Sequence, residues 1–127
     1  MNVFLRGSVK MFENKQGISA IVFDRAIRLF CPLGKDMYQA TIKVAVIPGE
    51  FLFDFCEVDR KIKALSSESL IAEDVAVRVY QIMQEYKPLQ TTVSVFAESN
   101  THFPVTIIKT DKEGNSNEKN RQQSHRY

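Results

Sequence analysis

Residues 39–50 read QATIKVAVIPGE, and this stretch decides how the rest of the sequence is interpreted. Side chains alternate from residue 39 to residue 47, and the apolar members fall on one face: Ala40, Ile42, Val44 and Val46. Successive residues of a strand point to opposite faces, so a period of two predicts a strand with one buried face. Pro48-Gly49 then predicts a turn, because proline fixes φ and glycine tolerates conformations that other residues avoid.

Further strands are expected on both sides of this one. Residues 3–11 and 18–23 predict a hairpin joined by a turn at residues 13–17. Residues 51–55 predict a short strand or a bulged continuation. Two more strands, rich in Val, Thr and Ile, are expected at residues 91–97 and 103–108.

Two helices are expected between these groups of strands. The first covers residues 57–65, and the second covers residues 70–86 with Ser67 or Ser69 as its N-cap. The apolar residues of the second helix share one face at the helical period: Ala72, Val75, Val79, Ile82, Met83 and Tyr86. The order of strands, two helices and strands predicts an α+β fold in which two helices cover one face of an antiparallel sheet. Free sheet edges favour pairing with other copies, so we expect a homo-oligomer such as a barrel built from several subunits.

Length and composition limit the remaining organisation. With 127 residues, 44% of them hydrophobic, the chain has room for one core, so residues 1–108 are expected to form a single domain. Residues 109–127 hold five Lys/Arg against three acids and almost no apolar residue, which predicts a disordered polar tail. Such a tail either keeps the protein soluble or makes a weak contact with nucleic acid.

The sequence contains no secretory signal pattern and no apolar stretch of membrane-spanning length. We therefore expect a cytoplasmic protein that does not contact a membrane. The two cysteines, Cys31 and Cys56, lack metal or redox spacing and are expected to be free thiols. The histidines, His102 and His125, have no second ligand at zinc spacing, so no metal site is predicted.

Cys31 follows an apolar run and precedes Pro32, where a strand would leave its sheet. This position suits a nucleophile at the mouth of a loop, with Lys35 and Asp36 available to activate the thiol. It equally suits a small buried hydrophobic residue, which is the commoner role of a lone cysteine. Local pattern alone leaves both interpretations open.

Several acids and one tyrosine have the chemistry of a site. Glu73 lies in the first turn of the second predicted helix, where a carboxylate either accepts paired N–H bonds from a guanine or pterin base or complements the helix dipole. Asp36, Tyr38 and Asp54 are candidates to donate or shuttle protons, and Glu98 is a candidate second acid for holding a base. Each also suits an ordinary turn or strand-edge residue.

The stretch from residue 30 to residue 50, FCPLGKDMYQATIKVAVIPGE, resembles a segment of the 7-cyano-7-deazaguanine nitrile reductase family. Cys31 and Pro32 fall on the family's Cys-Pro motif, and Ala40 and Ile42 fall on its Ala-x-Ile motif. Residues 47–50 fall on its Ile-Pro-Gly-Glu motif. At the same register, Glu73 and Asp74 fall on the Glu-Asp of the family's His-Glu-Asp. The resemblance covers residues 18–97.

The resemblance implies the tunnelling fold, or T-fold, with active sites between subunits. It also implies that the Cys31 thiolate adds to the nitrile carbon of a 7-deazaguanine base to form a thioimidate, while Glu73 holds the base edge. The general acid of the family falls on Tyr38, and the histidine that precedes the base-anchoring Glu falls on Ala72. The NADPH-binding segment of the family falls on residues 54–59, which have lost both lysines and gained acids.

A shortened archaeal branch similar to this family also lacks the NADPH segment, and it converts a tRNA-borne cyano-deazaguanine to archaeosine by an amidinotransferase reaction. The sequence is more similar to that branch, which implies a non-reductive enzyme without a cofactor that acts on a free base or on tRNA. Two alternatives stay open. One is an NADPH-dependent reductase with a rearranged cofactor site, and the other is a non-catalytic module that binds a purine or pterin.

Overall fold

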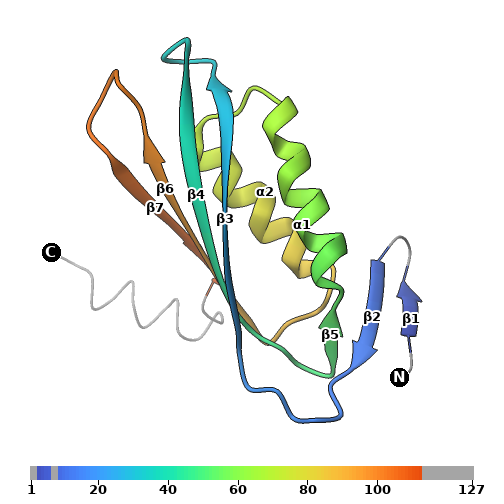
Figure 1. Ribbon diagram of the computed structural model, residues 1–127. Coiled ribbons are helices and arrows are strands. Elements are labelled where there is room, and N and C mark those ends of the chain that lie inside the picture. The colour runs from blue at the N-terminus through green and yellow to red at the C-terminus, as the bar shows by residue number, and fades with distance from the viewer. Residues whose placement is uncertain (1–2, 7–8, 113–127) are drawn as a thin grey trace, which may run out of the picture.

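The computed structural model describes residues 3–6 and 9–112, and it consists of two antiparallel sheets and two α-helices (Figure 1). The elements in chain order are β1 (Val3–Arg6), β2 (Val9–Glu13), β3 (Ile21–Cys31), β4 (Asp36–Ile47), β5 (Phe51–Phe53), α1 (Phe55–Ala64), a 3-10 turn (Leu65–Ser67), α2 (Ala72–Gln84), β6 (Gln90–Glu98) and β7 (Val105–Thr110). The larger sheet has the order β3-β4-β6-β7, and the smaller one has the order β1-β2-β5. The expected α+β class is confirmed.

Strand β4 lies in the middle of the larger sheet, as its alternating pattern predicts. It pairs with β3 on one side and with β6 on the other. One face is buried along most of its length, at Tyr38, Ala40, Ile42, Val44 and Val46. Register is fixed wherever one face is buried, because a slip of one residue would turn every apolar side chain toward water.

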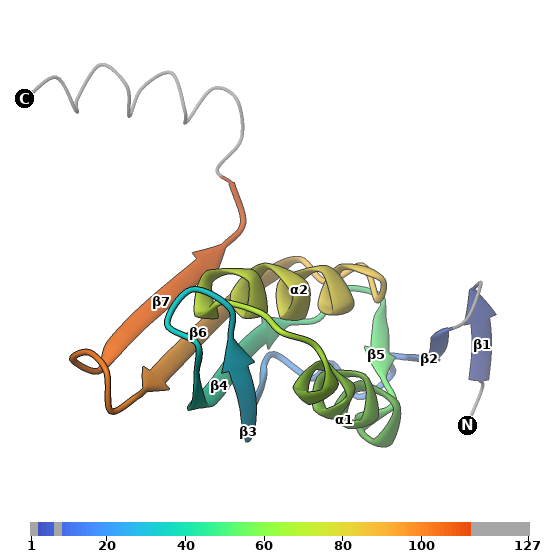
Figure 2. The same ribbon diagram turned by 90° about the horizontal axis from the view of Figure 1, so that it is seen from above.

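Both helices lie against the same face of this sheet, with α1 beside β3 and α2 beside β6 and β7 (Figures 1 and 2). The predicted apolar stripe supplies fully buried side chains at Val75, Val79 and Met83 of α2, and at Tyr86 in the turn that follows the helix. The opposite sheet face carries no helix of the described chain and exposes Val22, Phe30, Met37, Phe96 and Ile108. Among the described residues, no helix combines the length and the apolar character needed to span a membrane.

The predicted N-terminal hairpin is wrong in its pairing. Strand β1 pairs with β2, and β2 pairs with β5, so this region forms the separate smaller sheet instead of an edge of the larger one. Residues 18–20 lie outside any strand, and the strand expected there begins at Ile21. Strand β3 instead pairs along its whole length with β4, and on its other edge Phe30 forms an isolated bridge with Ser69.

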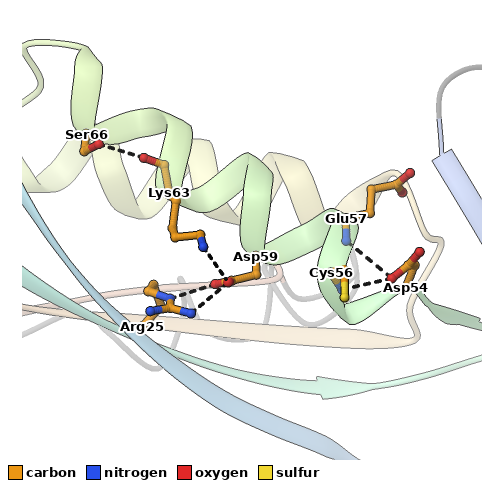
Figure 3. A network of polar contacts seen from close by, with 7 residues as sticks. All are labelled: Arg25, Asp54, Cys56, Glu57, Asp59, Lys63 and Ser66. Atoms are coloured by element: carbon orange, nitrogen blue, oxygen red, sulfur yellow. Dashed lines mark hydrogen bonds and ion pairs between the residues drawn. The ribbon is translucent and has the colours of Figure 1, made fainter.

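Strand β3 also extends well beyond the expected end at residue 23. It runs to Cys31 because it pairs with β4 along its whole length, and Arg25, which interrupts the apolar pattern on its inner face, pairs with an acid of α1. The Arg25 guanidinium donates from Nε and Nη2 to the two carboxylate oxygens of Asp59, both at 2.7 Å, and Lys63 Nζ lies 3.3 Å from the same carboxylate (Figure 3). The hydrogen bond from Arg25 is the main cause that holds the pKa of Asp59 below its usual range.

The two helices begin differently from the prediction. Helix α1 starts at Phe55, because Asp54 caps it by accepting the backbone N–H groups of Cys56 and Glu57 (Figure 3). The N-cap of α2 is Ile71, which makes no side-chain capping bond, so the expected cap at Ser67 or Ser69 is wrong. Ser67 instead bonds back to the Ala64 carbonyl within the 3-10 turn.

The C-terminal strand is displaced by two residues from its expected range, at Val105–Thr110 instead of 103–108. Residues 109–112, expected as the start of the tail, therefore belong to the domain. Asp111 accepts hydrogen bonds from the Tyr80 hydroxyl and from the Thr91 N–H at 2.9 Å. The rest of the predicted tail, residues 113–127, lies outside the described residues.

Candidate active site

Three segments that are far apart in the sequence meet at one end of the larger sheet: the β3–β4 connection, the start of α2 and the β6–β7 connection (Figure 1). Antiparallel order places both hairpin connections at the same end. Helix α2 begins beside them because the chain returns to this end through the 3-10 turn. The ends of five elements therefore surround one position.

A pocket of about 240 Å³ lies at this position. Its lining comes from all three segments: Cys31, Leu33, Gly34, Asp36 and Tyr38 from the first hairpin, Ile71, Ala72 and Glu73 from the start of α2, and Ala97, Ser99, Thr101, His102, Val105 and Ile107 from the second hairpin. Most small-molecule pockets measure about 300–1,000 Å³, so this one suits a ligand smaller than a drug. Apolar walls with a few converging polar groups are typical of a binding site.

Cys31 is the last residue of β3, and its side chain is half-buried in the pocket wall. Its thiol sulfur accepts the Gly34 N–H at 3.4 Å, and its carbonyl accepts the Lys35 N–H at 2.7 Å. Lys35 adopts a left-handed φ of 56°, which closes the tight connection between the two strands. The turn thus holds the sulfur at the pocket, where it is accessible to a ligand.

Tyr38 is buried, and its hydroxyl donates to the Leu70 carbonyl at 2.6 Å. This bond ties β4 to the segment that leads into α2. Burial, followed by electrostatic interaction with Cys31, Glu73 and Asp74, raises the pKa of Tyr38 to about 12. Tyr38 therefore keeps its proton at neutral pH and fixes the distance between the Cys31 loop and the start of α2.

Two carboxylates also line the pocket. Glu73 is exposed in the first turn of α2, on the side away from the helix's buried stripe, as expected. Asp36 is the first residue of β4 and pairs with Cys31 across the hairpin. One of its oxygens accepts the N–H of the following residue, Met37, at 2.8 Å. The structure thus brings Cys31, Asp36, Tyr38 and Glu73 together around one pocket.

Asp54 and Glu98 do not line this pocket. Asp54 lies at the start of α1, and its carboxylate is 3.3 Å from Lys10 Nζ. Burial opposes ionisation there, but the hydrogen bonds from Cys56, Glu57 and Lys10 lower the pKa of Asp54 overall. Glu98 is exposed on β6 and points away from its pocket-lining neighbour Ala97, because adjacent strand residues face opposite sides.

His102 also lines the pocket. From the sequence we expect no metal site at this residue, and the sequence does not indicate its place in the pocket. It lies in the β6–β7 connection, where Ser99 and Thr101 hold the loop through a 2.8 Å contact between their hydroxyls. The signal that could have found it is topological. The sheet order β3-β4-β6-β7 places the β6–β7 connection beside the connection that follows Cys31.

A larger and mainly apolar cavity of about 370 Å³ lies between β3 and the start of α1. Its lining includes Cys56, which is an exposed free thiol, as well as Phe53 and Phe55. None of the candidate residues of the first pocket borders this cavity. In residues 3–6 and 9–112, no three His, Cys, Asp or Glu side chains form a group that could hold a metal ion.

Comparison with known proteins gives a likeness in structure only. No family model matches the sequence, and no curated protein matches it. The solved structures that share the fold include the crystal structure of the archaeosine synthase QueF-Like in the apo form. The superposition has a TM-score of 0.70 at 15% sequence identity, and it covers 76% of this chain and 97% of that chain. The likeness supports the family resemblance at the level of the fold.

Proposed function

We propose that the protein is an enzyme of 7-deazaguanine metabolism that acts on the nitrile of 7-cyano-7-deazaguanine through Cys31. The observation that carries the proposal is the convergence of Cys31 and Glu73 on one pocket, 42 positions apart in sequence. A fold shared with an archaeosine synthase adds support, because the reaction that resemblance implies uses these two residue types.

In the proposed reaction, Glu73 accepts two N–H bonds from the edge of the base, and the apolar pocket wall covers its ring. The Cys31 sulfur then forms a bond to the nitrile carbon, one π bond of the nitrile breaks, and the nitrile nitrogen gains a proton. The product is a covalent thioimidate. Attack by ammonia releases the thiol and leaves an amidine, so no reduction and no cofactor are required.

The reductase alternative receives no support from the site. Residues 54–59, which fall on the NADPH segment of the family, form the start of α1 and do not line the pocket. Asp54 and Asp59 keep their negative charge in ion pairs with Lys10 and Arg25. A phosphate-bearing cofactor would meet two carboxylates there.

Incubation with free 7-cyano-7-deazaguanine is expected to add the mass of one base to each chain, as measured by intact-protein mass spectrometry. Cys31→Ala should show no added mass, and Cys56→Ala should match the wild type because that exposed thiol lies outside the pocket.

If the wild type binds the base without a mass change, the non-catalytic module is correct. A tRNA that carries the same base tests which form is the substrate, and a fall in NADPH absorbance would favour the reductase.

We propose further that the protein works as a homo-oligomer. Strands β3 and β7 end the larger sheet among the described residues, and the helix-free face exposes Val22, Phe30 and Ile108. An open edge and an apolar face both favour association with other copies. Light scattering after size exclusion should give a mass several times the 14.6 kDa of one chain, and a monomer at micromolar concentration would contradict this.

A further inference from the structure

The proposed reaction needs a group that takes the proton of the Cys31 thiol and delivers it to the nitrile nitrogen. Tyr38 is unsuited to this role, since its proton is held by the Leu70 carbonyl and its pKa is raised to about 12. One carboxylate oxygen of Asp36 is already engaged, because it accepts the Met37 N–H at 2.8 Å. The residues named from the sequence thus leave the proton transfer unassigned.

His102 lines the same pocket as Cys31 and Glu73, from the opposite hairpin. The two hairpins meet closely at Gly34, where a Cβ atom would lie 3.7 Å from Thr101 Oγ1 and 3.8 Å from Cys31 Sγ. The residue before His102 therefore borders the turn that holds the sulfur. Ala72, which replaces the histidine of the family motif, lines the pocket too, so this wall lacks the family's own imidazole.

The His102 side chain is exposed, and its ring is hydrogen-bonded to the backbone of the next residue. Its Nδ1 lies 2.6 Å from the Phe103 carbonyl oxygen, and a carbonyl oxygen only accepts hydrogen bonds, so Nδ1 carries a proton. The other ring nitrogen, Nε2, is then the atom that exchanges protons. A backbone bond at Nδ1 is a common way to set the tautomer of a working histidine. Imidazole is also the side chain that ordinarily exchanges protons near neutral pH.

We infer that His102 is the proton carrier of the reaction proposed for this pocket. Its Nε2 takes the proton as the S–H bond of Cys31 breaks, and the same proton passes to the nitrile nitrogen as the C–S bond forms. Protons and electrons balance without a further reactant. This inference rests on the proposed function, and it moves the acid–base role from the first hairpin to the second.

The test compares rates of adduct formation by rapid quenching and mass spectrometry in His102→Asn, His102→Ala and wild type. The amide nitrogen of Asn can keep the bond to the Phe103 carbonyl but offers no group in place of Nε2. General acid–base catalysis contributes about 10²–10⁴-fold, so both variants should form the adduct at least about 100-fold more slowly. Added imidazole should restore part of the rate in His102→Ala, where the side chain leaves space. Asn100→Ala, in the same loop but not in the pocket lining, is the control that keeps the wild-type rate.

The outcomes separate the inference from the proposed function. Slow adduct formation in both variants, with rescue by imidazole, supports His102 as the proton carrier. A wild-type rate in His102→Asn, with loss only in His102→Ala, means that His102 merely holds the loop and overturns the inference alone. Absence of an adduct in the wild type overturns the proposed function together with the inference.

Discussion

Glu73→Ala is expected to bind 7-cyano-7-deazaguanine at least about 100-fold more weakly than the unchanged protein. Two N–H bonds to one carboxylate are lost, and a hydrogen bond to a charged group contributes about 1.5–3 kcal/mol. Calorimetric titration on the Cys31→Ala background measures this binding free from covalent chemistry. Glu73 is exposed, so its removal should leave the fold intact apart from a small loss of charge at the helix start.

Asp74→Ala is the matched control, because Asp74 lies in the same helical turn, is also exposed and does not border the pocket. Both variants remove one negative charge near the helix N-terminus, and only Glu73→Ala removes a pocket acceptor. An equal loss of affinity in the two variants would mean that charge alone attracts the base, and it would refute the anchoring role of Glu73.

Tyr86→Phe is expected to lower the free energy of unfolding by about 2–3 kcal/mol. Tyr86 is 2% exposed, and its hydroxyl donates to Glu57, which is 4% exposed and also accepts the Lys10 N–H at 3.1 Å. The substitution removes one of two hydrogen bonds to the same buried carboxylate oxygen, and a hydrogen bond to a charged group contributes about 1.5–3 kcal/mol. This arrangement joins α1, the turn after α2 and the smaller sheet.

Urea unfolding of Tyr86→Phe and of Tyr80→Phe measures the difference. Tyr80 also donates to a carboxylate, that of Asp111, but it is only half-buried, so its loss should cost less than about 1 kcal/mol. A cost for Tyr86→Phe no larger than that for Tyr80→Phe would show that water reaches Glu57 and would contradict the prediction.

The hydrogen bond between Tyr86 and Glu57 should also change how stability depends on pH in the alkaline range. Burial, followed by the bond to Glu57, raises the pKa of Tyr86 above its ordinary value of 10.0. The pKa of Tyr86 is higher in the folded state than in the unfolded state, so the protonated hydroxyl stabilises the fold at pH values below the unfolded-state pKa. This contribution is lost as pH rises through the folded-state pKa. Stability should therefore fall above pH 10.0, and it should fall less steeply in Tyr86→Phe.

The sequence predicted the parts of the fold that depend on local pattern. The alternation in β4 and the buried stripe of α2 are confirmed, because each follows from burial of one face, and β4 ends at Ile47, directly before Pro48. The parts that failed depend on distant partners. Arg25 on the inner face of β3 pairs with Asp59 of α1, and no local pattern shows that pair. The choice of β5 as the partner of β2 is likewise a tertiary outcome.

For the candidate site, too, local sequence signals were informative and the tertiary arrangement was not predictable. Cys31 and Glu73 were found through their spacing, and the structure brings them to one pocket. Asp54 was selected for its charge, whereas the structure uses it to cap α1, a role that its place before the helix could have indicated. His102 was missed because single residues in loops carry no periodic signal, and only the sheet order places them.

The position of the pocket at one end of the sheet has a consequence for how this chain can diverge. The pocket is built from the ends of strands and from their connections, and only Tyr38 and Ala97 of its lining belong to the buried cluster. Exchange of residues 99–104 would therefore replace one wall of the pocket while every pairing of β4 stays in place. New substrate preferences are accessible on this scaffold by loop exchange, without redesign of its interior.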